Sequence, residues 1–188
     1  MNIQITGASG SGKTFLGKKI AKILECNFVD TDDILWVWKD GIQPYTIAVD
    51  DEKACETLRN ELINNESTIA SGLFYPWSEP IINMFDMLVI IETDDEVRKQ
   101  RIIKREYELY GNRSKKGGDM YEQFNKYLDW AMEYDYSNDK LGSKEETRKW
   151  ANKFKGKILY LDGNGEIEEN INIVLKIVKE NNSRRSKW

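Results

Sequence analysis

A run of small residues, GASGSGKT at positions 7–14, is the feature that most constrains what this chain can fold into. The run fits the pattern G-x-x-x-x-G-K-[ST], with a short apolar strand pattern before it and helically spaced Leu16 and Ile20 after it. In such a loop, glycines let successive backbone N–H groups turn toward phosphate oxygens, and the helix N-terminus adds partial positive charge. The sequence therefore predicts a phosphate-binding loop.

Each part of this loop has an expected task. Lys13 is expected to reach the β- and γ-phosphates of ATP, and the Thr14 hydroxyl is expected to ligate Mg²⁺, so ATP and Mg²⁺ are the expected cofactors. The residues expected to bind the nucleotide are Gly7, Ser9, Gly10, Ser11, Gly12, Lys13 and Thr14.

Short strand patterns alternate with helical patterns along the rest of the chain. Strands are predicted near residues 2–6, 27–30, 67–72, 87–92 and 157–163, and the run MLVIIE at 87–92 is typical of a strand buried on both faces. Helices are predicted over 50–64, 94–107 and 120–134, and around 171–178. This alternation indicates a three-layer α/β fold with a parallel sheet, and the length of 188 residues indicates one domain over 1–188.

Composition excludes several classes of function. The chain has no histidine, which excludes Ser-His-Asp and Cys-His catalysis and removes the commonest transition-metal ligand. The formal charge of −4 disfavours nucleic acid as a partner, and no apolar run is long enough to predict a membrane span. Cys26 and Cys55 show no metal-binding spacing, and no signal peptide is expected at the start, so we expect a cytoplasmic protein.

With this loop between a strand and a helix, the chain resembles the P-loop kinases of the nucleoside monophosphate kinase group, which includes adenylate kinase, shikimate kinase and gluconate kinase. The resemblance implies a five-stranded parallel sheet in the order 2-3-1-4-5. It also implies an acceptor-binding segment at about 31–65 and an arginine-bearing helical lid at about 105–120. The expected chemistry is in-line transfer of the γ-phosphoryl group of ATP.

Acidic residues follow the second predicted strand. The sequence Asp30-Thr31-Asp32 resembles the D-x-D pattern of shikimate kinase, which implies that Asp30 supports Mg²⁺ and that Asp32 orients the acceptor hydroxyl. The alternative is an acidic turn or a helix N-cap. The third predicted strand ends in Ser71 and Gly72 without an acid, and this absence argues against motor-type and AAA-type ATPases.

Arginines are concentrated in the helix predicted over 94–107. Arg98, Arg101 and Arg105 are spaced at i, i+3 and i+7, and Arg113 follows in a glycine-rich stretch. The resemblance implies that such arginines clamp ATP and neutralise charge in the transition state, and Arg105 and Arg113 are the expected catalytic pair. The alternative is a solvated basic helix face.

The acceptor segment contains few basic residues. Between Thr31 and Leu58 only Lys39 and Lys53 are basic, and acids stand in VDDEK (49–53), where shikimate kinase has F-R-x-x-E. These departures argue against a nucleoside monophosphate or a small acid as the acceptor. Aromatic residues instead favour a neutral or cationic acceptor, such as a nucleoside, a sugar or an amino-substituted compound. They are Trp36, Trp38, Tyr45, Phe74, Tyr75 and Trp77, and the alternative is that they pack a core.

The sequence therefore predicts an ATP- and Mg²⁺-dependent phosphotransferase that acts on a hydroxyl group of a small molecule such as a nucleoside or a sugar. One alternative is a nucleoside monophosphate kinase whose phosphate-binding arginine comes from elsewhere, for example Arg59. Another is a regulatory NTPase of the topology modulation type that acts through a protein partner. The D-x-x-x-W spacing from Asp32 to Trp36 suggests this second alternative.

Overall fold

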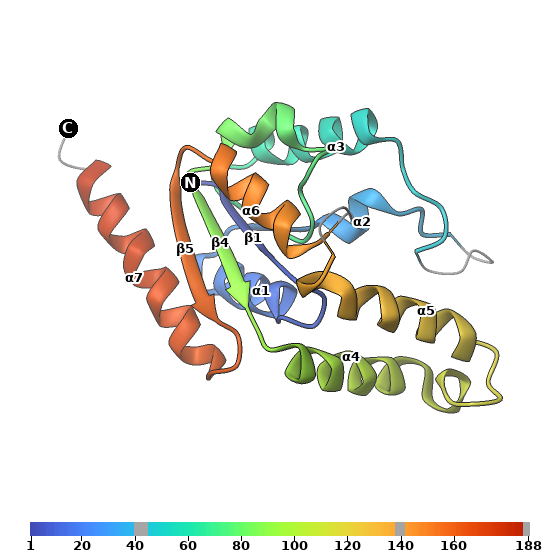
Figure 1. The fold of residues 1–188 in the computed structure, drawn as a ribbon. Helices are drawn as coiled ribbons and strands as arrows, with labels where there is room; N and C mark the ends of the chain where they lie inside the picture. Colours follow the sequence, from blue (N-terminus) through green and yellow to red (C-terminus); the bar gives the residue numbers. More distant parts are fainter. Residues whose placement is uncertain (40–44, 138–141, 186–188) are drawn as a thin grey trace.

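The computed structural model describes residues 1–39, 45–137 and 142–185, so residues 40–44 of the predicted acceptor segment lie outside the described part. Its centre is a parallel sheet of five strands in the order β2-β3-β1-β4-β5, as predicted, with helices on both faces (Figure 1). The strands are β1 (Ile3–Gly7), β2 (Asn27–Asp30), β3 (Thr68–Ser71), β4 (Met87–Glu92) and β5 (Lys157–Asp162).

The helices follow the predicted alternation, with two additions. The short helix α2, directly after β2, and the helix α6, which precedes β5 in the chain, were not predicted. The helices are α1 (Lys13–Leu24), α2 (Thr31–Leu35), α3 (Asp51–Asn64), α4 (Asp95–Tyr110), α5 (Tyr121–Met132), α6 (Lys144–Lys153) and α7 (Ile167–Arg185), with short 3-10 helices η1 (Glu79–Met84), η2 (Gly111–Ser114) and η3 (Glu133–Asp135). Among the described residues, none of these helices has the length and apolar character needed to span a bilayer.

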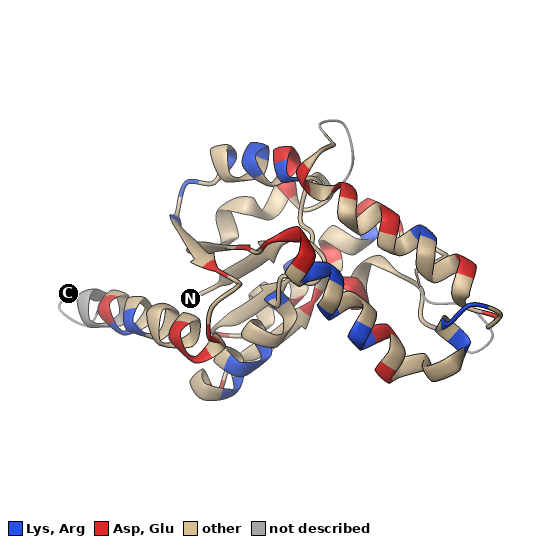
Figure 2. Ribbon diagram, turned by 60° about the horizontal axis from the view of Figure 1, so that its bottom comes forward, with Lys and Arg blue, Asp and Glu red and all other residues tan. Residues whose placement is uncertain are grey.

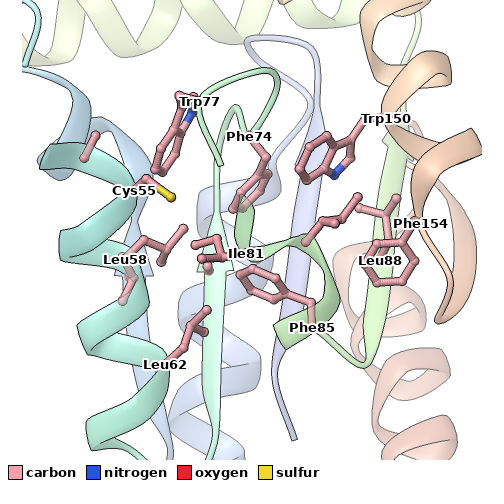
Figure 3. Close-up of a cluster of buried hydrophobic side chains, with 14 of the residues drawn as sticks. Cys55, Leu58, Leu62, Phe74, Trp77, Ile81, Phe85, Leu88, Trp150 and Phe154 are labelled. Carbon is pink, nitrogen blue, oxygen red and sulfur yellow. The ribbon is translucent and has the colours of Figure 1, made fainter. Parts of the chain in front are cut away.

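Alternating residues of β4 divide the core between the two faces of the sheet. Leu88 and Ile90 pack on one face, in a cluster that α3, η1 and α6 complete with Leu58, Ile81 and Trp150 (Figure 3). The other residues of β4 pack on the opposite face against α1 and α7, in the cluster Met87, Val89, Ile91, Leu16, Ile20, Val174 and Val178. This two-sided burial explains why β4 is an unbroken apolar run.

The helices α4 and α5 form a hairpin that projects from the carboxyl end of β4, away from the sheet (Figure 1). Ile102, Phe124 and Ala131 form its own small apolar cluster. Basic and acidic residues are interspersed along its surface (Figure 2). The hairpin includes residues 105–120, where a lid is predicted, and α5 extends it beyond that range.

Candidate active site

The phosphate-binding loop runs from the end of β1 into α1. Gly10 and Gly12 have positive φ angles of 81° and 95°, and Gly12 occupies the N-cap position of α1 in a left-handed conformation. No side chain caps this helix, so its first backbone N–H groups are left for another acceptor. A Cβ on Gly10 would lie 2.7 Å from the carbonyl oxygen of Arg98, so only glycine lets the loop pack this closely against α4.

Lys13 begins α1, and its ammonium lies over the loop. The Lys13 Nζ donates to the carbonyl oxygen of Ala8 at 3.3 Å. Burial lowers the pKa of Lys13, and the carboxylates of Asp32 and Asp30 partly offset this effect. The structure therefore brings the predicted lysine and the two predicted acids into one electrostatic group.

Asp30 and Asp32 occupy the end of β2 and the first turn of α2. The backbone N–H of Asp32 donates to Oδ1 of Asp30 at 3.2 Å, so Asp30 is the N-cap of α2. The N-cap alternative is thus correct for Asp30, and it leaves the second carboxylate oxygen available for a ligand. Burial raises the pKa of Asp32, Lys13 opposes this rise and Asp30 adds to it, while Asp33 is exposed.

The end of β3 lies between these acids and the loop. Ser71 pairs with Asp30 in the sheet register, and its buried hydroxyl has no hydrogen-bond partner. The buried hydroxyl of Ser11 in the loop is likewise unpaired. Thr31 Oγ1 accepts from the backbone N–H of Leu73 at 3.1 Å, and a Cβ on Gly72 would lie only 1.8 Å from Thr31 Oγ1.

These groups fit the requirements of Mg²⁺. Within the described residues, no group of three or more carboxylate or thiol side chains is arranged to hold a metal ion. Mg²⁺ does not need such a group when nucleotide phosphates and water complete its octahedral shell. The Thr14 hydroxyl and the Asp30 carboxylate are the candidate protein ligands, and the unpaired Ser71 hydroxyl beside Asp30 suits a water of that shell.

Arg105 reaches the same region from α4. Its guanidinium donates to the phenol oxygen of Tyr127 on α5 at 3.0 Å, and it interacts electrostatically with Lys13 and Asp32. Tyr45 also interacts with Asp32, Arg105 and Tyr127. Partial desolvation, strengthened by the charge of Asp32, raises the pKa of Tyr45, so its phenol is neutral. Sequence reasoning missed Tyr127, because nothing in the sequence indicates that α5 folds back onto α4 at this point.

The other arginines have different surroundings. Arg98 is fully buried, and its guanidinium forms an ion pair with Asp135 at 2.7 Å, so it joins α4 to η3. Arg101 is exposed. Arg113 lies in η2, where both arms of its guanidinium bind Asp119 at 3.0 and 2.7 Å. The structure does not place Arg113 beside Lys13, and its catalytic role stays a prediction.

The aromatic residues of the predicted acceptor region separate into two groups. Phe74 and Trp77 are buried in the core beside η1 (Figure 3), which makes the packing interpretation correct for this pair. The residues Trp36, Trp38 and Tyr45 lie outside this core and beside Asp32. Asp50 caps α3, and Arg59 on α3 hydrogen bonds to the Cys55 thiol, apart from the group around Lys13.

A family model described as an AAA domain, AAA_18, matches residues 3–125, which is more than half of the chain. This match corrects the expectation that the missing acid after β3 argues against AAA-type ATPases. The match extends from β1 into α5.

Individual relatives agree with this match. The uncharacterized protein YqaC of Bacillus subtilis is 29% identical over 180 residues, which cover 96% of this chain and 98% of that protein. A gluconokinase of Arabidopsis thaliana is 35% identical over 74 residues, 36% of this chain and 39% of that protein. The shikimate kinase of Bacteroides thetaiotaomicron has the same fold, with a TM-score of 0.56, 16% identity and coverage of 95% of this chain and 98% of that chain.

Proposed function

Because this chain belongs to the AAA-domain family of P-loop proteins, we propose that it transfers the γ-phosphoryl group of ATP to a hydroxyl group of a small molecule. The observation that carries this proposal is the electrostatic group formed by Lys13 and Asp32 at the carboxyl end of the sheet. In parallel α/β sheets, ligands bind at this end, next to the strand where the order reverses, which here is β1. Resemblance to shikimate kinase and gluconokinase supports the same class of reaction.

Different residues bind the nucleotide with its Mg²⁺ and the acceptor. The uncapped N-terminus of α1 and Lys13 bind the phosphates, while Thr14 and Asp30 would hold Mg²⁺. Mg²⁺ supplies charge neutralisation along the phosphates when it is bound. Asp32 orients the acceptor hydroxyl and accepts its proton, a role that a carboxylate with a raised pKa performs well near neutral pH. Arg105 neutralises negative charge from the lid side.

The acceptor that suits this region is an uncharged or cationic molecule, such as a sugar or a nucleoside. A carboxylate or phosphate on the acceptor would need its own cation. Among the described residues, Lys13 and Arg105 are the cations that interact with Asp32, and the phosphates of ATP need both. We also propose a cytoplasmic location, which agrees with the two free thiols of Cys26 and Cys55.

The test is ADP release from Mg-ATP with a panel of sugars, nucleosides, nucleoside monophosphates, amino sugars and shikimate. We expect a rate that rises at least tenfold with one class of acceptor. The variant Lys13→Ala should lose this rate by a factor of about 10² or more, because it removes a transition-state contact to phosphate. Lys22→Ala, at the exposed far end of α1, is the matched control. A slow rate that no acceptor changes would indicate a regulatory NTPase instead.

A further inference from the structure

Three aromatic rings form an open corner beside the candidate active site. The ring of Tyr45 stands nearly perpendicular to the ring of Trp36, at 81° and 5.8 Å between centroids, and to the ring of Trp38, at 80° and 5.2 Å. Tyr45 is 50% exposed and Trp38 is 48% exposed. We call these three residues the aromatic corner. Large aromatic surfaces left open in this way are available to a ligand.

Backbone hydrogen bonds hold the aromatic corner in place. The N–H of Val37 donates to the carbonyl of Ile47 at 2.9 Å, and the N–H of Val49 donates to the carbonyl of Leu35 at 2.8 Å. These two bonds pair the stretch after α2 with the stretch before α3 in antiparallel fashion, which sets Tyr45 against the indoles. The geometry is therefore built by the fold and does not depend on one exposed side chain.

A hydrogen bond connects the aromatic corner to the backbone of Asp32. The indole N–H of Trp38 donates to the backbone carbonyl of Asp32 at 3.1 Å. The phenol of Tyr45 interacts electrostatically with Asp32 and Arg105. A molecule whose hydroxyl reaches the Asp32 carboxylate would therefore place its remaining atoms against the aromatic corner.

The charges of this region favour a cation there. Asp30 and Asp32 are half-buried, and Asp33 lies beside them on α2. The positive charges of Lys13 and Arg105 offset the charges of these acids. The negative charges of the ATP phosphates would offset those two cations in turn. Arg105 also already donates to Tyr127. With nucleotide bound, the region is negative, and it has aromatic faces on which an ammonium group is stabilised.

We propose that the phosphoryl acceptor is a hydroxyl compound with a positively charged amino group, such as an amino alcohol or an amino sugar. The ammonium group lies against Trp38 and Tyr45, and the hydroxyl points to Asp32. The role of this compound as phosphoryl acceptor rests on the proposed function, whereas the cation site itself rests on the aromatic corner and the acids.

The binding test uses two probes of the same shape. Choline is compared with its uncharged carbon isostere, in which a tert-butyl group replaces the trimethylammonium group, by calorimetry with Mg²⁺ and a non-hydrolysable ATP analogue. We expect choline to bind about tenfold more tightly, as a partly desolvated cation–aromatic contact allows. Equal or weaker binding of choline would overturn the inference.

Variants locate the site. Trp38→Leu and Tyr45→Leu should each remove most of the preference for choline, whereas Trp38→Phe should keep part of it because a ring remains. Tyr160→Leu is the matched control, because Tyr160 is 56% exposed on β5, an edge strand away from the aromatic corner. If the Tyr160 and Trp38 variants lose the preference equally, the cation does not bind at the aromatic corner.

Turnover separates this inference from the proposed function. Glucosamine and glucose are compared as acceptors at a pH where the amine is charged, and we expect kcat/KM to be about tenfold higher for glucosamine. Phosphorylation of neutral acceptors without such a preference overturns the inference and leaves the proposed function intact. A preference for choline in binding without transfer to any acceptor keeps the cation site and overturns the proposed function.

Discussion

Burial destabilises the negative charge of the Asp32 carboxylate. Burial raises its pKa above the ordinary value of 3.8, and the neighbouring Lys13 offsets this only in part. A group kept in this state lowers stability at neutral pH and is better explained by chemistry than by folding. Residue-level predictions should therefore separate activity from stability at this position.

We predict that Asp32→Asn lowers kcat by a factor of about 10² to 10⁴, as expected for loss of a proton acceptor. In the parent protein, kcat should fall as pH falls through the raised pKa of Asp32, so the acid limb lies above pH 3.8. The free protein should gain stability over the same window, because the folded state binds the proton more tightly than the unfolded state. At pH 7 the Asn variant should consequently melt at a higher temperature.

The measurements are a pH profile of kcat and thermal melting of the free protein. Asp33→Asn is the matched control, because Asp33 is the exposed neighbour in the same helix turn. An Asp33 variant with the same loss of activity, or an Asp32 variant that melts lower at pH 7, would contradict the assignment.

Residue types in fixed patterns predicted much of the candidate site. The loop motif singled out Lys13 and Thr14, and the D-x-D pattern singled out Asp30 and Asp32, which the structure brings into electrostatic contact with Lys13. Arg113 could not be placed in this way, because its partner Asp119 lies only six residues away and competes with any ligand. The spacing of residues in the sequence does not predict whether a local ion pair of this kind forms.

At the scale of elements, a buried side chain joins the two helices of the α4–α5 hairpin. Arg98 donates to the carbonyls of Thr93 at 3.2 Å and Ala131 at 3.1 Å, and to the carboxylate of Asp135 at 2.7 Å. Its backbone also lies against Gly10 of the phosphate-binding loop. Arg98 therefore connects α4, the end of α5 and the loop.

Replacement of Arg98 by Met should destabilise the protein by about 3 kcal/mol, because two backbone carbonyls lose their donor and the Asp135 carboxylate keeps only Lys144 among the described residues. The measurement is urea unfolding. Arg101→Met is the control, because Arg101 lies in the same helix and is exposed. A loss below about 1 kcal/mol would show that this connection is dispensable, since exposed ion pairs contribute no more than that.

The end of β3 packs closely against α2 at Gly72, where there is no room for a side chain. Gly72 has a φ angle of 143°, and any Cβ there would meet the Thr31 hydroxyl. Gly72→Ala should therefore displace α2 together with Asp32, with losses of more than about 2 kcal/mol in stability and of most activity. Gly165→Ala, where a Cβ meets nothing closer than 3.9 Å, should melt like the parent. Parent-like activity of the Gly72 variant would contradict this placement.

Elements with a clear apolar period were predicted well, and α6 was not. Within α6 only Trp150 and Ala151 are buried, and its other residues are mostly charged. Its one signal was the Ser143-x-x-Glu146 capping pattern, in which the Ser143 hydroxyl accepts from the Glu146 N–H at 3.2 Å. The helix is held by the Trp150 indole, which donates to Gln4 of β1 at 2.9 Å, and this contact between residues far apart in sequence is not visible in a local pattern.

At the scale of the whole molecule, the strand order brings segments that are distant in sequence together at the carboxyl end of the sheet. The loop after β1, the acids after β2 and the glycine after β3 meet there because these strands are neighbours in the sheet. The α4–α5 hairpin projects from the same end of the sheet (Figure 1), and its Arg105 interacts electrostatically with Lys13. The strand order could be predicted only from the resemblance, since short strands do not encode their own neighbours.

The central claim is that the phosphoryl group leaves ATP for a hydroxyl group and not for water. The most direct test follows the phosphorus by NMR during turnover of Mg-ATP with the best acceptor of the panel. The account predicts a phosphomonoester of the acceptor, formed in equal amount to ADP and absent with Lys13→Ala. Release of inorganic phosphate at a rate that no acceptor changes would contradict it.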